Sequence, residues 1–127
     1  PISISVLHFA SQSGAKRLGG IVLVSGFAGR IPGLSTLDGF DVDAYADRAK
    51  IDAATIHAMS PILHHVISTN DYAVPPAVSE QLAQRLGGTV HRVPDAGHFL
   101  DREGFTELPV VLQAVEDVVQ GAGVAGR

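Results

Sequence analysis

Three short apolar runs, each rich in β-branched residues, most constrain how this chain can fold. They span residues 21–24, 62–68 and 89–93, and glycine or proline bounds each of them. Runs of this length and composition are typical of buried strands rather than buried helices. Because helical spacing of apolar residues alternates with these runs, the chain predicts βαβ crossovers and a parallel sheet covered on both faces.

The helical pattern occurs in four segments, which are residues 2–13, 43–58, 77–86 and 108–120. Strands and helices together predict one α/β domain over residues 1–127, in three αβα layers. Two segments do not fit the alternation. Residues 26–42 form a long glycine-rich loop, and loops of that length are more often functional than accidental. Residues 121–127 are small and are expected to form a flexible tail.

Composition excludes several classes of function. The formal net charge is −4 and the nine Lys and Arg residues are scattered, which argues against nucleic-acid binding. The absence of cysteine excludes disulfides and thiolate metal sites, and it fits a reducing compartment. No apolar run reaches the roughly 18 residues that span a bilayer, and the N-terminus lacks a signal-peptide pattern. We therefore expect a cytoplasmic protein with no membrane partner.

An acid and a base follow two of the predicted strands. Asp71 comes after the second strand and His98 after the third, at the strand ends where open α/β sheets bind ligands. An aspartate that accepts the imidazole Nδ1–H leaves Nε2 free to take a proton from a nucleophile. Alone, each residue is more often an ordinary loop residue, but this order and placement indicate a catalytic pair. Asp95 and Asp101 flank His98 and are expected to be turn residues.

The histidines do not predict a metal site. His64 and His65 are neighbours in one strand, so their side chains point to opposite faces of the sheet. His91 is expected to be a strand residue that faces solvent or packs against a helix. The remaining histidines outside the candidate pair, His8 and His57, are isolated. We therefore expect no metal and no cofactor.

Several segments resemble a known family. They are Ile21 to Phe27, Ser68 to Asp71 followed by Val74-Pro75, Gly97-His98-Phe99, and Gly104 to Glu107. They resemble the small serine hydrolases typified by retinoblastoma-binding protein nine and the bacterial YdeN-like proteins. The resemblance covers nearly the whole chain, and the segments around Asp71 and His98 are its specific parts. It implies an α/β-hydrolase fold, a triad acid at Asp71, a triad base at His98, and hydrolysis of small esters or amides.

The chain departs from this family at the nucleophile. The family places its serine in a Gly-His-Ser-x-Gly elbow, which leads into a helix resembling residues 4–10, and Pro1-Ile2 stands where that elbow should finish. No Gly-x-Ser-x-Gly occurs in the sequence. We therefore expect the C-terminal portion of the fold, without its first strands, its nucleophile elbow and one oxyanion-hole N–H.

Other serines offer poor replacements. Ser3, Ser5 and Ser13 fall on a predicted helix rather than on a strained turn. Ser25 is the best substitute because it ends a strand beside Gly26, although a loop serine that satisfies local backbone groups is the commoner case.

Three interpretations remain open. The chain is part of a hydrolase with little activity alone, completed by a missing N-terminal half. Alternatively, it is a non-catalytic binding module that uses the glycine-rich loop with Phe27, Phe40 or Phe99. The third interpretation is self-association, because open sheet edges favour a homo-oligomer. Pairing of Asp71 with His98 favours the first.

Overall fold

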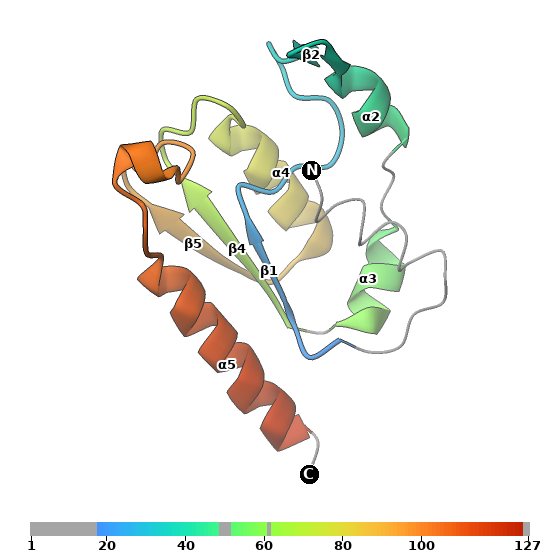
Figure 1. Ribbon diagram of the computed structural model, residues 1–127. Helices are drawn as coiled ribbons and strands as arrows, with labels where there is room; N and C mark the ends of the chain where they lie inside the picture. The colour runs from blue at the N-terminus through green and yellow to red at the C-terminus, as the bar shows by residue number, and fades with distance from the viewer. Residues whose placement is uncertain (1–17, 49–51, 61, 126–127) are drawn as a thin grey trace.

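The computed structural model describes residues 18–48, 52–60 and 62–125, and all structural statements below concern these ranges. A parallel sheet of three strands lies at the centre (Figure 1). Its order is β1-β4-β5, so the second strand along the chain lies in the middle. The strands are β1 (Ile21–Val24), β4 (Leu63–Ser68) and β5 (Thr89–Val93). This is the parallel α/β sheet that the three apolar runs predict.

Helices cover both faces of this sheet. Helix α4 (Pro76–Leu86) packs against β4 on one face and contacts α3 (Ala53–Met59). Helix α5 (Pro109–Ala125) crosses the other face, where it contacts β1 and β4 (Figure 1). Every residue of β4 is buried, as expected for a central strand covered on both faces. None of these helices, within the described ranges, is long and apolar enough to cross a membrane.

Local sequence explains where the helices begin and end. Pro76 occupies the first turn of α4, where its missing N–H costs no hydrogen bond, and Gly87 ends the helix with a φ of 71°. Asp52 caps α3 because its carboxylate accepts the N–H of Ala54 at 3.1 Å. The main apolar core then forms between β1, β4, α3 and α4.

The structure differs from the expected element boundaries in three places. The loop expected over residues 26–42 contains an antiparallel hairpin of β2 (Thr36–Leu37) and β3 (Phe40–Asp41). The helix expected over 43–58 is two helices, α2 (Val42–Arg48) and α3, and α2 directly follows β3. Helix α5 continues to Ala125, past the point at which a tail was expected. The helix expected over 2–13 lies outside the described residues.

The hairpin follows from its turn residues. Asp38 and Gly39 both have positive φ, of 49° and 80°, which a two-residue type I′ turn requires. Asp-Gly is a strong hairpin signal, but the strands beside it have only two residues each and do not alternate over a recognisable length. The hairpin was therefore not recognisable within this glycine-rich segment of the sequence.

Gly88 directly precedes β5 and lies against the backbone of β4, and its replacement tests that packing. It has a φ of 103°, and an added Cβ would lie 2.5 Å from the carbonyl oxygen of Leu63. We expect Gly88→Ala to lower the free energy of unfolding by about 3 kcal/mol, measured by urea denaturation. Gly39→Ala is the matched control, because its φ is also positive but nothing lies within 4 Å. It should cost about 1 kcal/mol. Equal losses would mean that the contact with Leu63 contributes nothing.

Candidate active site

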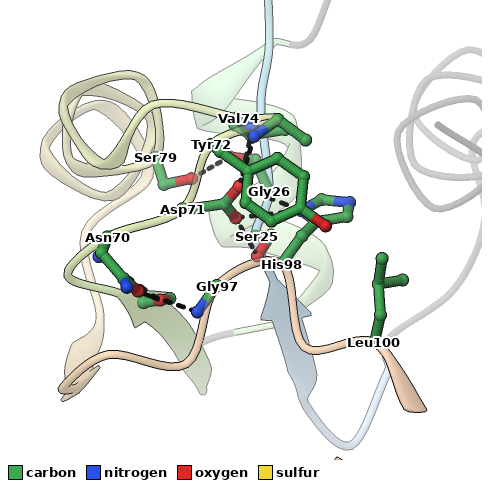
Figure 2. A network of polar contacts seen from close by, with 12 residues as sticks. Ser25, Gly26, Asn70, Asp71, Tyr72, Val74, Ser79, Gly97, His98 and Leu100 are labelled. Carbon is green, nitrogen blue, oxygen red and sulfur yellow. Dashed lines mark hydrogen bonds and ion pairs between the residues drawn. The ribbon is translucent and has the colours of Figure 1, made fainter. Parts of the chain in front are cut away.

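Three polar side chains meet beyond the carboxyl ends of the three parallel strands. Ser25 follows β1, Asp71 follows β4, and His98 lies in the loop after β5 (Figure 2). Parallel strands bring their carboxyl ends to the same edge of a sheet, which is why residues so distant in sequence come together here. As predicted, the side chains of Asp71 and His98 are in contact.

Asp71 lies at the centre of this group. Its side chain is only 2% exposed. Oδ2 accepts the Ser25 hydroxyl at 2.8 Å, and Oδ1 accepts the backbone N–H groups of Ala73 and Val74, both at 2.9 Å. Nδ1 of His98 lies 3.1 Å from Oδ1 and 3.0 Å from Oδ2. Hydrogen bonds of this number and strength hold a buried carboxylate in a single orientation.

These contacts decide the charge of Asp71. Burial raises the pKa of the Asp71 carboxyl, but the hydrogen bonds from His98, the Val74 N–H, Ser25 and the Ala73 N–H together outweigh it. The pKa of Asp71 therefore lies below its usual value, and the group is a carboxylate at neutral pH. A negative charge beside Nδ1 favours the tautomer that carries its proton there, which leaves Nε2 of His98 available to accept one.

The loop that carries His98 is held by Glu103 and Asn70. Glu103 Oε2 accepts the backbone N–H of His98 at 2.9 Å and that of Leu100 at 3.0 Å. Asn70 Oδ1 accepts the Gly97 N–H at 2.8 Å (Figure 2). Gly97 has a φ of 57°, and an added Cβ would lie 2.6 Å from the Glu103 carboxylate. Backbone hydrogen bonds on both sides of His98 thus fix where its imidazole can lie.

Sequence reasoning did not identify Glu103 or Asn70. Asn70 adjoins Asp71 and resembles any turn asparagine, and Glu103 is one of several acids in its stretch of the chain. Their roles depend on loop conformation, which spacing does not encode. Asp95 lies in a turn, as expected, whereas Asp101 begins a short 3-10 helix, η1 (Asp101–Glu103). Asp95 has a φ of 53° and its N–H bonds Thr69 Oγ1, while the Asp101 carboxylate accepts the adjacent N–H of Arg102.

Ser25 does not meet the imidazole as a nucleophile would. Its hydroxyl donates to Asp71 Oδ2, so its proton is directed to the carboxylate rather than to His98. The residue is 9% exposed and has a φ of 48°, a conformation that a non-glycine residue seldom adopts. This geometry makes Ser25 a support for the acid. The other serines considered from sequence, Ser3, Ser5 and Ser13, lie outside the described residues.

The remaining strand histidines form a pair away from this site. His64 Nδ1 lies 2.8 Å from His91 Nε2, and the two rings stack with centroids 5.1 Å apart. His65 bonds instead to the carbonyl of Gly87. Burial, and then the nearby His91, lowers the pKa of His64. Across the described ranges, no three His, Asp or Glu side chains are grouped as metal ligands would be.

An apolar pocket of about 300 Å³ adjoins His98. It lies between the end of β1 and the segment that carries the β2–β3 hairpin and α2. Of the aromatic residues considered as contacts, Phe27 and Phe40 line this pocket. Phe99 does not, because it packs edge-on against Phe105 with ring centroids 5.6 Å apart.

Comparison with known proteins supports the resemblance noted from sequence. Residues 3–117 match the family described as serine hydrolase. The chain is 41% identical over 96 residues to the putative hydrolase YdeN of Bacillus subtilis (strain 168), an alignment that covers 76% of this chain. It also resembles the crystal structure of the ydeN gene product from B. subtilis, with a TM-score of 0.78 and 33% identity over 92% of this chain. The chain spans 47% of the first protein and 60% of the solved chain.

The lowered pKa of Asp71 predicts a specific acid sensitivity. A carboxyl group whose pKa is lower in the folded state stabilises the fold above its unfolded pKa of about 4, and this contribution disappears as pH falls through the folded value. We expect Asp71→Asn to be about 2 kcal/mol less stable to unfolding than the wild type at pH 7. On acidification, the free energy of unfolding should fall less in the variant than in the wild type. Chemical denaturation from pH 7 to pH 3 measures both. Asp95→Asn, at an exposed turn, is the control, and a parallel pH dependence in wild type and Asp71→Asn would contradict the prediction.

The hydrogen bonds of Glu103 predict that its replacement will reduce the protection of nearby backbone amides from hydrogen exchange. We expect Glu103→Ala to speed amide hydrogen exchange at His98 and Leu100 by about tenfold, because both N–H groups lose their acceptor. Glu103→Gln retains one acceptor oxygen and should have a smaller effect. Glu107→Ala, at an exposed acid nearby, should leave both amides unchanged. Unchanged exchange in Glu103→Ala would show that the loop is held by other contacts.

Proposed function

Because the chain belongs to the serine hydrolase family, we propose that it supplies the acid and the base of a Ser-His-Asp triad that hydrolyses small esters or amides. Asp71 is the acid and His98 is the base. The observation that carries this proposal is the contact of His98 Nδ1 with both carboxylate oxygens of a buried Asp71. An ordinary turn aspartate is exposed and does not need so many donors.

The chemistry divides between the two residues. His98 Nε2 accepts the proton of a serine hydroxyl as its oxygen bonds to the substrate carbonyl carbon. The Asp71 carboxylate stabilises the positive imidazolium that results, and His98 then returns the proton to the departing alcohol or amine. A water molecule, deprotonated in the same way, releases the acid and restores the serine. Ser25, with its hydroxyl on Asp71 Oδ2, supports the carboxylate in both halves of the reaction.

The nucleophile in this proposal is not Ser25. Its hydroxyl bonds Asp71, and the sequence contains no Gly-x-Ser-x-Gly elbow in which another serine would be exposed. We propose that the serine and its oxyanion-hole donor belong to a segment that this chain does not contain. The chain alone then has little esterase activity, because both the nucleophile and part of the electrostatic stabilisation of the transition state are missing.

Ester hydrolysis by the chain itself tests the acid–base pair. An imidazole held by a carboxylate can still activate water weakly toward an activated ester such as p-nitrophenyl acetate. We expect slow release of p-nitrophenol that falls by about tenfold in His98→Asn and falls also in Asp71→Asn. His91→Asn, which removes an imidazole of β5 outside the pair, is the matched control and should retain the rate. Equal rates in wild type and His98→Asn would contradict the proposed base and favour a non-catalytic binding or self-associating module.

Labelling with a fluorophosphonate tests the nucleophile separately. Intact mass followed by peptide mapping should find no adduct on Ser25. An adduct on Ser25 that disappears in His98→Ala would overturn this part of the proposal, since it would mean that Ser25 itself completes the triad.

A further inference from the structure

The β2–β3 hairpin exposes large apolar side chains to solvent instead of burying them in the core. Leu37 is 56% exposed and Phe40 is 51% exposed, although they face each other as partners in the hairpin register. Phe40 also contacts Tyr45 of α2, with ring centroids 5.7 Å apart. Exposed apolar side chains gathered around a cavity commonly mark a ligand-binding surface.

These side chains form the outer wall of the pocket beside His98. The end of β1 with Phe27 also lines the pocket, and His98 lies at its edge. Few of the lining residues have a polar group in the side chain, namely Ser25, Tyr45 and His98. Its other side chains are apolar, and they come from both the sheet end and the hairpin segment.

The charged side chains near the pocket form ion pairs with one another outside it. Arg30 bonds both carboxylate oxygens of Asp47 and lies 3.6 Å from Asp43. None of these three residues lines the apolar pocket, and no Lys, Arg, Asp or Glu is among its described lining residues. A carboxylate or ammonium group inside it would lose its hydration without gaining a Lys, Arg, Asp or Glu side chain as an ion-pair partner. The pocket therefore selects against charge.

We propose that this pocket binds the uncharged, apolar acyl group of the ester or amide substrate, with Leu37 and Phe40 as specificity-determining residues. The inference rests on the proposed hydrolase function, because it assumes that the scissile carbonyl lies beside His98. A volume of about 300 Å³ holds about ten non-hydrogen atoms at roughly 30 Å³ each. Short aliphatic chains and single aromatic rings fit this limit.

Binding of methyl esters to the intact chain tests the pocket without requiring catalysis. Methyl acetate, methyl butanoate and methyl hexanoate are titrated while the backbone amide signals of Leu37, Phe40 and Val42 are followed by NMR. We expect binding to tighten by about fourfold for each added methylene, and the shifts to centre on these amides. Monomethyl succinate has as many non-hydrogen atoms as methyl hexanoate but ends in a carboxylate, so it should bind at least tenfold more weakly.

Two exposed leucines provide matched variants. Leu37→Ala should weaken methyl hexanoate by about fourfold. Leu112→Ala removes a leucine of similar exposure (61%) from α5 and should not change binding. Affinity independent of chain length, equal binding of monomethyl succinate, or equal effects of the two variants would each overturn the proposal.

The same titration in His98→Asn separates the pocket from the chemistry. The pocket's apolar walls do not depend on the imidazole, so chain-length dependence should persist in this variant. If that dependence is present but ester hydrolysis does not require His98, the proposed hydrolase function fails while the pocket stands. If hydrolysis requires His98 but chain length has no effect, the acyl pocket fails and the hydrolase function stands.

Discussion

A buried carboxylate is costly unless its oxygens are satisfied by donors, and the arrangement of the strand ends around Asp71 meets this requirement. The donors come from separate parts of the chain: a hydroxyl after β1, two N–H groups in the turn that leads to α4, and an imidazole after β5. Among the described residues, no buried polar side-chain atom lacks a partner. The carboxylate thus links the segments that follow all three strands. The loop that carries His98 is held in place by further hydrogen bonds of its own.

The hydrogen bonds that hold this loop are made to its backbone N–H groups. Glu103 accepts from residues on both sides of Phe99, whose φ of 56° is unfavourable for a side chain of that size. The edge-on packing of Phe99 against Phe105 contributes apolar contact on the same loop. Contacts that are local in sequence therefore hold the strained residue of the loop, while Asn70 holds Gly97 and Asp71 holds the His98 imidazole, each from 27 residues away.

Sequence was sufficient for the elements whose signals are local and repeated. The β-branched runs bounded by glycine and proline predicted all three strands of the sheet, and the helical spacing of apolar residues over 77–86 predicted α4. The Asp71–His98 pair followed from the positions of the two residues after consecutive predicted strands, together with the family resemblance. The hairpin was missed because its strands are too short to show alternation. The contacts of Ser25 and Glu103 were missed because they depend on side-chain direction within loops, and the His64–His91 stack depends on the register between β4 and β5.

Strand order also explains why the acid, rather than the base, has two side-chain partners. Neighbouring strands lie about 4.8 Å apart, so groups on the outer strands of a three-stranded sheet are separated by about 10 Å. In the order β1-β4-β5, Ser25 and His98 follow the two outer strands and Asp71 follows the middle one. Asp71 can therefore contact both, whereas a hydroxyl after β1 is poorly placed to reach an imidazole after β5. Since His98 contacts Asp71 through Nδ1, the proposed base has to receive its proton at Nε2, on the other side of the ring. His98 lines the apolar pocket, so the proposed acyl site and the proposed proton acceptor lie at the same edge of the sheet.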